Sequence, residues 1–300
     1  MNSCSQRLMH LHRCRGITRK TIRHILHDDP ALSHIYHLTA SDIKKRYNIP
    51  LEKSTTIVQD LHHDRLYNQV VRDFSHYKVI TIVDENYPPM LKTIKDAPLV
   101  LYTIGNTSLL NSQPALSVIG TRKPSKEAKG KLNHIVRPLL DDKWVIISGM
   151  ARGIDSFSHQ LSLHCKGKTI AVLGSGFDNI YPQENVGLFQ RICEEGLVIS
   201  EYPPNCPPKP YYFPERNRII SGLSFGTLVI EAMERSGTLI TVDQALDQGK
   251  EVYAVPGSPL IQQTIGCHKM IQDGAKLVHH ANDILEDWEN SPEKRMTTIT

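Results

Sequence analysis

The sequence has neither paired cysteines nor a long apolar run. Its six cysteines are scattered, and no two of them have the C-x-x-C spacing, which disfavours a disulfide framework and a zinc site alike. No apolar segment approaches the roughly 18 residues that cross a bilayer as a helix, and no apolar leader segment follows Met1. We therefore expect a reduced, cytoplasmic protein that does not contact the membrane.

The sequence also lacks the glycine patterns that bind nucleotide cofactors. Gly167-Lys168-Thr169 ends like a P-loop, but Ser162 stands where that motif needs glycine, and the tripeptide precedes a strand instead of following one. Gly174 and Gly176 begin a dinucleotide-binding pattern that fails at Asn179. We therefore expect no cofactor and no ATP- or NAD-dependent chemistry.

No combination of side chains identifies a reaction. Nine of the fifteen histidines precede residue 80 and none forms an H-E-x-x-H set, so surface histidines are favoured over a metal site. The loops carry carboxylates, with no matching histidine except His159 in a predicted helix. These carboxylates are Asp155, Asp178, Glu184, Glu201 and Glu231. We expect Asp155 to cap the helix that follows it, and we expect no catalytic residue and no metal ligand.

The 300 residues suffice for one large domain and a small one. The formal net charge is +4, but residues 1–80 carry 13 Lys and Arg against 7 Asp and Glu, which is +6 and leaves −2 for the remainder. A basic N-terminal segment is typical of a protein that meets an anionic polymer. It is equally typical of an ordinary solvated helical surface, and both interpretations stay open.

The first 77 residues have helical periodicity and are predicted to form a small all-α domain. Thr18 is expected to cap a helix over residues 19–27, and two short helices are expected over 31–38 and 41–47. A longer helix is predicted over about 55–75, with its apolar side chains facing inward.

From residue 78 onward the pattern changes to apolar strands that alternate with helices. The expected strands lie at 79–83, 99–102, 115–119, 144–148, 169–173, 197–200, 228–230, 252–255 and 276–278. This alternation indicates an α/β fold over 78–288, with a mostly parallel sheet and helices on both faces. Residues 289–300 are expected to be a polar tail.

One of the predicted helices begins at Ser125 and has a clear buried face. Its expected buried residues are Ala128, Leu132, Ile135, Val136, Leu139 and Leu140. Pro138 lies inside this pattern and should kink or shorten the helix.

Four glycine-containing turns follow strands in the α/β region. Because the carboxyl ends of parallel strands share one edge of a sheet, these turns are expected to lie together. Glycine lets backbone N–H groups approach an anion, and a helix N-terminus adds about half a positive charge. With arginines inside and near the turns, the pattern predicts a phosphate-binding surface. The candidate residues are Gly120, Thr121, Arg122, Gly149, Arg152, Gly153, Gly174, Arg216, Asn217, Arg218, Ser236, Gly237 and Thr238.

The same segments resemble the DNA-processing protein A (DprA/Smf) family of bacteria. The segments that carry the resemblance are VIGTRKPS (118–125), ISGMARGID (147–155), TIAVLGSGFDNIYPQEN (169–185), ISEYPP (199–204), FPERNRIISGLS (213–224) and ERSGTLITVDQALDQGKEVYAVPGSP (234–259). The resemblance covers about residues 80–285. Residues 1–75 are similar only in position and type to the sterile-alpha-motif-like (SAM-like) domain that many members carry.

This resemblance implies an extended Rossmann-like domain that binds single-stranded DNA through its phosphates and forms homodimers. It also implies that the protein loads RecA onto incoming strands during natural transformation, protects them from nucleases and relieves the block by single-strand-binding protein. The family's principal DNA-contacting arginine corresponds to Arg122. The resemblance assigns further phosphate contacts to Gly149, Arg152 and Gly153, and to the R-N-R turn at 216–218.

Two positions depart from the family pattern, because Gln183 replaces a frequent Lys or Arg and His268 replaces a frequent Asn. The chain also resembles the lysine-decarboxylase-like nucleotide phosphoribohydrolases, which suggests an enzyme as the alternative. Glu215-Arg216 and Gly237-Thr238 match that pattern, but Thr241 stands where those enzymes have a catalytic glutamate. The resemblance therefore favours a binding protein over an enzyme.

Overall fold

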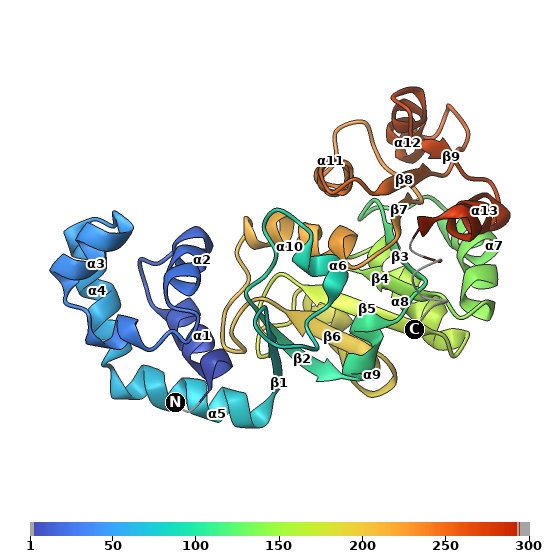
Figure 1. Ribbon diagram of the computed structural model, residues 1–300. Helices are drawn as coiled ribbons and strands as arrows, with labels where there is room; N and C mark the ends of the chain where they lie inside the picture. The colour runs from blue at the N-terminus through green and yellow to red at the C-terminus, as the bar shows by residue number, and fades with distance from the viewer. Residues whose placement is uncertain (1–2, 293, 295–300) are drawn as a thin grey trace. The chain divides into compact units, whose positions relative to one another are not determined.

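The computed structural model describes residues 3–292 and residue 294, and the chain forms two compact units. Unit 1 holds the described residues of Met1–Tyr87 together with Pro98–Thr103. Unit 2 holds Pro88–Ala97 and the described residues of Ile104–Thr300 (Figure 1). The domain boundary expected after residue 77 comes from sequence periodicity and stays a prediction.

Unit 1 consists of helices and one antiparallel pair of strands. Its helices are α1 (Cys4–Arg13), α2 (Arg19–Asp28), α3 (Ala40–Tyr47), α4 (Leu51–Leu61) and α5 (Asp64–His76), with a 3₁₀ turn, η1 (His34–His37). Strand β1 (Lys78–Thr81) pairs with β2 (Val100–Gly105), so that Lys78 lies opposite Thr103. Thr18 caps α2 as expected, because its hydroxyl accepts a hydrogen bond from the backbone N–H of Thr21.

The single helix expected over 55–75 is wrong, because this segment contains the end of α4 and nearly all of α5. The two helices are separated at His62 and His63, and His63 has an extended backbone with φ −91° and ψ 108°. Apolar spacing continues across the break, since Ile57, Leu61 and Val70 are all buried. Periodicity alone therefore could not reveal the interruption.

The described part of unit 2 contains a parallel sheet in the order β6-β5-β4-β3-β7-β8-β9. The strands are β3 (Ala115–Ile119), β4 (Val145–Ser148), β5 (Lys168–Leu173), β6 (Leu197–Ser200), β7 (Gly226–Val229), β8 (Glu251–Ala254) and β9 (Lys276–Leu277). Every neighbouring pair is parallel. The expected mostly parallel sheet is therefore confirmed.

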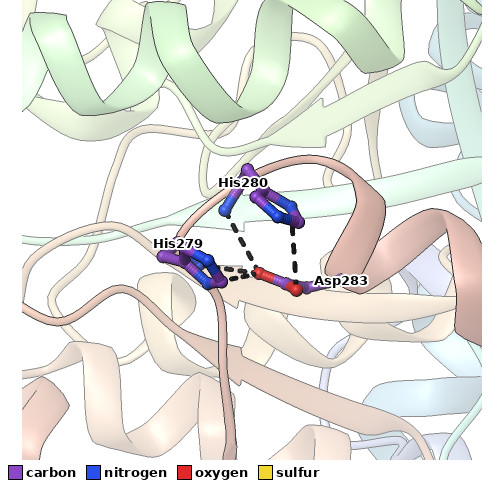
Figure 2. Close-up of side chains that lie close together, drawn as sticks. All are labelled: His279, His280 and Asp283. Atoms are coloured by element: carbon purple, nitrogen blue, oxygen red, sulfur yellow. Dashed lines mark hydrogen bonds and ion pairs between the residues drawn. The ribbon is translucent and has the colours of Figure 1, made fainter.

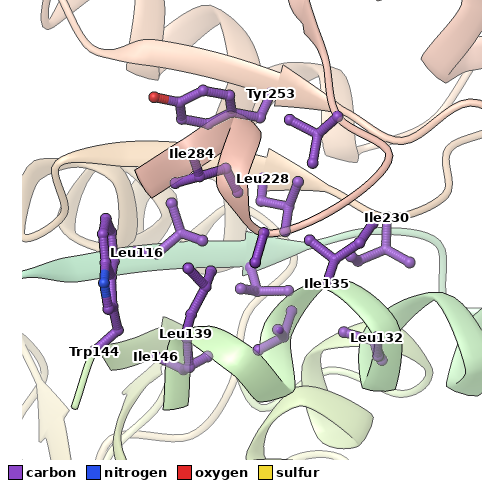
Figure 3. Packing of buried hydrophobic residues seen from close by; sticks show 14 of the residues in the cluster. Leu116, Leu132, Ile135, Leu139, Trp144, Ile146, Leu228, Ile230, Tyr253 and Ile284 are labelled. Atoms are coloured by element: carbon purple, nitrogen blue, oxygen red, sulfur yellow. The ribbon is translucent and has the colours of Figure 1, made fainter. Parts of the chain in front are cut away.

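Helices cover both faces of this sheet. They are α6 (Pro89–Lys92), α7 (Ala128–Asp141), α8 (Ile154–His164), α9 (Val186–Glu195), α10 (Tyr212–Gly222), α11 (Thr238–Asp247), α12 (Gln262–Gln272) and α13 (Asn282–Asn290), with 3₁₀ turns η2 (Thr107–Asn111) and η3 (Gln183–Asn185). Leu116 and Val118 of β3 enter the core cluster with α7 and α13 (Figure 3). Ser117, between them, hydrogen-bonds to the carbonyl of Ile220 in α10 on the other face. The alternation along β3 thus follows the two-residue period of a strand.

Helix α7 buries the six apolar residues that its sequence predicts. It continues through Pro138 to Asp141, so the proline does not shorten it. The missing N–H lies within the last turn of the helix, where only one hydrogen bond is lost.

Helix α10 was not expected, and it corrects the R-N-R turn proposed at 216–218. All three residues lie within this helix, and Arg216 and Arg218 are buried.

Helix α13 runs to Asn290, two residues into the segment expected to be a polar tail. Residues 293 and 295–300 of that segment lie outside the described residues. Within the described part of the chain, no helix combines the length and apolar character needed to cross a membrane.

Candidate anion-binding site

The four glycine-containing turns follow strands that lie side by side in the order β5-β4-β3-β7. Residues 174–176 follow β5, 149–153 follow β4 and 120–122 follow β3, while the segment after β7 leads to 236–238 and helix α11. Because these strands are parallel, their carboxyl ends form one edge of the sheet. The turns are thus gathered where the sequence predicts them.

Two cavities open at this edge. The larger has a volume of about 360 Å³ and the smaller about 50 Å³. The predicted residues that line the larger cavity are Gly120, Thr121, Arg122, Arg216, Asn217, Ser236, Gly237 and Thr238. The smaller is lined by Arg122, Arg152, Gly174 and Arg216, together with Met150, Ala151, Tyr181, Pro182 and Phe213. Arg122 and Arg216 line both cavities, so the two form one continuous surface.

Arg122 is the exposed cation of this surface. Its side chain is open to solvent, and none of the carboxylates within residues 3–292 forms an ion pair with it. The backbone of its turn is held in place, because the backbone N–H of Thr121 donates to the carbonyl oxygen of Glu231 at 2.7 Å. The Arg122 guanidinium is therefore available to a ligand while its backbone is held in place.

The Glu231 carboxylate holds the other end of the same loop. It is fully buried and accepts hydrogen bonds from the backbone N–H and the hydroxyl of Ser125 at 2.8 and 2.6 Å. The Lys131 ammonium donates to it at 2.9 Å and supplies the balancing charge. Glu231 thus has a structural role in positioning the 120–125 loop, and its charge is neutralised within the fold.

Arg216 forms the floor between the cavities. It is buried, donates to the carbonyl of Val172 and to the Asn217 side-chain oxygen, the latter at 3.0 Å, and lies 3.7 Å from the Asp155 carboxylate. Burial raises the pKa of Asp155, although Arg216 opposes the rise. Burial likewise lowers the pKa of Arg216, against the attraction of Asp155. Any side chain on Gly149 would overlap the Arg216 guanidinium, so this glycine makes room for the floor.

Asp155 is not the helix cap that the sequence suggests. The N-cap of α8 is Gly153, with φ 78°, and Asp155 is a buried residue of the first turn that faces Arg216. A positive φ favours glycine at this position. A β-carbon on Gly153 would also press against the carbonyl of Thr121 and the backbone of Arg122.

The structure places Arg218 and Arg152 in ion pairs. Arg218 does not line either cavity; its Nη2 donates to both carboxylate oxygens of the buried Glu201 at 2.8 Å. Arg152 is exposed and donates to Glu184 at 2.5 and 2.7 Å. That pair raises the pKa of Arg152 and lowers the pKa of Glu184 through the hydrogen bonds between them. An anion at Arg152 would therefore compete with Glu184.

The N-terminus of α11 closes the larger cavity. Gly237 is its N-cap and is exposed, and Thr238 is the first helical residue. The Ser236 hydroxyl is shielded from solvent, yet it has no hydrogen-bond partner among the described residues. A helix N-terminus next to an unsatisfied hydroxyl is suited to an anion.

Sequence reasoning missed two basic residues in the lining, Lys123 and Arg235, which flank predicted turn residues. Both are exposed. Their positions in the sequence, next to Arg122 and Ser236, could have identified them as lining residues. Of the described residues that line the larger cavity, Asp155 is the only carboxylate, and the position expected of a catalytic glutamate is Thr241.

Comparison with known proteins relates the chain to one family. The family model for DNA recombination-mediator protein A matches residues 78–289. DNA processing protein DprA of Bacillus subtilis is 42% identical over 229 residues, which covers 75% of this chain and 77% of the relative. DNA processing protein DprA of Streptococcus pneumoniae is 43% identical over 218 residues, covering 73% and 77%.

Solved structures agree. The X-ray structure of DNA processing protein A from Streptococcus pneumoniae has a TM-score of 0.84 at 35% identity, covering 94% of this chain and 97% of that one. DNA processing protein A from Helicobacter pylori, described for its single-stranded DNA binding mode, has a TM-score of 0.64 at 27% identity and covers 72% and 98%. The chain therefore belongs to the DNA recombination-mediator protein A family.

Proposed function

We propose that this chain binds single-stranded DNA along the two cavities and does not cut it. The observation that carries the proposal is the exposed Arg122, which has no carboxylate partner in the described chain and lines both cavities. A strand's phosphates could contact its guanidinium and the backbone N–H groups of the α11 N-terminus in succession. The single-stranded DNA binding described for the Helicobacter pylori relative supports this choice of ligand.

The aromatic residues beside the arginines agree with this ligand. Tyr181 is exposed, and its ring lies 5.5 Å from that of Phe213 between centroids. Aromatic rings beside a basic groove are typical of proteins that bind single strands with weak sequence preference, because every base has a face that stacks. Gly120, Thr121, Gly149, Gly153 and Gly174 are proposed to shape the backbone of this groove.

Arg152 is proposed as a second phosphate contact that exchanges Glu184 for DNA. Arg216 and Asn217 are proposed as the floor of the phosphate pocket. We propose no DNA contact for Arg218, since its ion pair with Glu201 stabilises the position of α10.

We further propose that the bound strand is handed to RecA in the cytoplasm, during natural transformation, by a homodimer. In this role the protein protects the strand and relieves the block by single-strand-binding protein. Membership of the recombination-mediator family supports this step. Its test is the rate at which RecA assembles on oligonucleotides coated with single-strand-binding protein. Acceleration is expected, and an unchanged rate would contradict it.

The binding proposal is tested by titrating labelled oligo-dT, a mixed-sequence strand and a duplex into the protein at several salt concentrations. We expect similar affinity for both strands and weaker binding of the duplex. The logarithm of the affinity should fall linearly with the logarithm of the salt concentration, by about 0.7 per neutralised phosphate. A preference for the duplex, or no salt dependence, would refute a single-strand phosphate groove.

The rival hypothesis is a nucleotide phosphoribohydrolase that uses the same pocket. The match of Glu215-Arg216 and Gly237-Thr238 to that pattern favours it, and Thr241 opposes it. Incubation with a panel of nucleoside monophosphates should release no base. Release by the wild type that disappears in Arg216→Ala, with circular dichroism showing that this variant is folded, would replace our proposal with the enzyme.

A further inference from the structure

A cluster of three metal-ligating side chains lies at the start of α13, outside the predicted site. His279 and His280 end the connection from β9, and Asp283 lies in the first turn of the helix (Figure 2). Their candidate ligand atoms all lie within 4.8 Å of one another. Figure 2 shows both imidazole rings beside the carboxylate.

Each histidine lies beside a different oxygen of the Asp283 carboxylate, at a separation close to that of two ligands of one small ion. The Nδ1 atom of His279 lies 3.0 Å from Oδ2 of Asp283, and Nδ1 of His280 lies 3.7 Å from Oδ1. Two ligands bound at about 2.0–2.2 Å to a tetrahedral Zn²⁺ are themselves about 3.3 Å apart. The two observed separations lie on either side of that value.

The side chain of His280 is 44% exposed, but its Nδ1 atom is not. Its Nδ1 is shielded from solvent and has no hydrogen-bond partner among the described residues. Polar atoms without access to water are normally paired with a hydrogen-bond partner or an ion. Oδ1 of Asp283, at 3.7 Å, is beyond hydrogen-bond distance of this nitrogen.

The Asp283 carboxylate is held in position by the backbone of the two histidines. Its Oδ2 accepts hydrogen bonds from the backbone N–H groups of His279 and His280 at 2.9 and 3.1 Å. The nearby Lys276 ammonium is itself paired with Asp287 at 2.7 Å, which reduces its repulsion of a cation.

We propose that His279, His280 and Asp283 bind one divalent transition-metal ion, with Zn²⁺ as the best-matched occupant. Two imidazole nitrogens and a carboxylate oxygen are a common donor set for Zn²⁺, and a water would fill the fourth position on the exposed side. The ion would tie the loop to α13, whose Ile284 and Trp288 belong to the buried core of unit 2. Binding to the folded state alone would therefore stabilise unit 2.

This site departs from the expectation that the histidines form no ligand set. That expectation rested on the i, i+4 spacing of histidines on one helix face. Here the spacing is H-H-x-x-D, and the two histidines precede the helix. The chain turn between His280 and Asp283 is what brings the three side chains together.

The test is a calorimetric titration of the chelator-treated full chain with Zn²⁺ near neutral pH. We expect one site in the wild-type protein, and an affinity lower by roughly 100-fold or more in the variant His279→Ala/His280→Ala. The double variant His24→Ala/His27→Ala is the matched control, because both histidines also face one carboxylate, Asp28, at 4.0 and 3.6 Å, but these three residues do not gather within 4.8 Å as the proposed ligands do. It should bind Zn²⁺ like the wild type.

Circular dichroism and tryptophan fluorescence establish that each variant is folded. Equal Zn²⁺ affinity in the wild type and the double variant would overturn the proposal, as would a wild type that binds no Zn²⁺. Loading with Co²⁺ separates this site from the free cysteines. The spectrum should lack a thiolate-to-metal charge-transfer band, and its presence in the single-site complex would place the ion on sulfur. Binding of oligo-dT by the same variant should be unchanged, so the result is independent of the proposed DNA site.

Discussion

The arginines of the loop after β3 and of helix α10 have opposite surroundings. Arg122 is exposed and no carboxylate of the described chain pairs with it, whereas Arg216 and Arg218 are buried and lie beside Asp155 and Glu201. A buried charge without its partner is costly, but an exposed one is solvated by water. The comparison separates an arginine that a ligand can use from arginines that the fold itself requires.

The backbone that carries Arg122 and the backbone that carries Arg216 and Arg218 are also held in place by different contacts. The loop of Arg122 is fixed by the carbonyl and carboxylate of Glu231 and by the close approach of Gly153. Helix α10 is fixed by its own arginine side chains, which reach Val172 in β5 and Glu201 just after β6. Arginine therefore stabilises the fold in α10 and is available to a ligand at position 122. Substitutions should affect stability in the first case and ligand binding in the second.

The largest loss of stability is expected for Arg218→Ala. This change leaves the Glu201 carboxylate, 1% exposed, without its bidentate partner. The free energy of unfolding of unit 2 should fall by about 3–5 kcal/mol. Urea denaturation followed by tryptophan fluorescence reports this unit, because both tryptophans, Trp144 and Trp288, lie in its core.

The double variant Arg218→Met/Glu201→Gln is the control for Arg218→Ala. It removes both charges and should recover part of the stability. If Arg218→Ala is as stable as the wild type, the ion pair with Glu201 does not support the fold. The distinction drawn between Arg218 and Arg122 would then be wrong.

A somewhat smaller loss is expected on acidification, through His159 beneath the pocket. Its Nε2 donates to the Gly149 carbonyl at 2.6 Å, and burial lowers the pKa of His159 to about 4. The unfolded chain, with a pKa near 6.5, binds a proton that the folded chain resists. This contribution is complete above about pH 6.5 and is lost as the pH falls towards 4, by up to about 3 kcal/mol.

Comparison of the wild type with His159→Gln across this pH range isolates the histidine from the carboxylates that also titrate in acid. The difference in unfolding free energy between the two proteins should change with pH, in favour of the wild type at neutral pH. A difference that is constant with pH would contradict a neutral buried imidazole.

Gly153→Ala should cost about 1–3 kcal/mol, because φ is 78° and the new β-carbon meets the backbone of Thr121 and Arg122. It should also weaken binding of single-stranded DNA, since Arg122 must move.

Gly130→Ala is the control in which the expected change in stability has the opposite sign. Gly130 lies in α7 with open space around its missing β-carbon, so alanine should stabilise by up to about 1 kcal/mol. If both substitutions change the stability equally, the backbone of Thr121 and Arg122 does not lie close enough to Gly153 to exclude a side chain.

Sequence periodicity predicts those parts of the fold whose causes are local. The six buried residues of α7 follow from 3.6-residue spacing, and the expected strand at 115–119 coincides with β3. The gathering of four turns at one sheet edge follows from the alternation of strands and helices.

The sequence could not show features that depend on distant partners. Arg216 and Arg218 look like surface residues after a proline-rich segment, but partners that include Asp155, Val172 and Glu201 satisfy them in the interior. The assignment of Arg218 to the phosphate surface came from its position near the glycine-containing turns and from the family motif, and the structure does not bring it to either cavity. Long-range charge pairing, and not propensity, is what sequence reasoning lacked.

The central claim is that Arg122 serves the ligand and not the fold. Arg122→Ala should change the free energy of unfolding by less than about 0.5 kcal/mol. Arg137→Ala is its matched control, because Arg137 is an exposed arginine of α7 that lines neither cavity, and it removes the same charge.

The most direct measurement is the affinity of wild type, Arg122→Ala and Arg137→Ala for labelled oligo-dT over a series of salt concentrations. We predict that Arg122→Ala lowers the affinity roughly 10- to 100-fold and reduces the salt slope by about one unit or less, while Arg137→Ala matches the wild type. Equal affinities and slopes for all three proteins would remove Arg122 from the site and contradict the account.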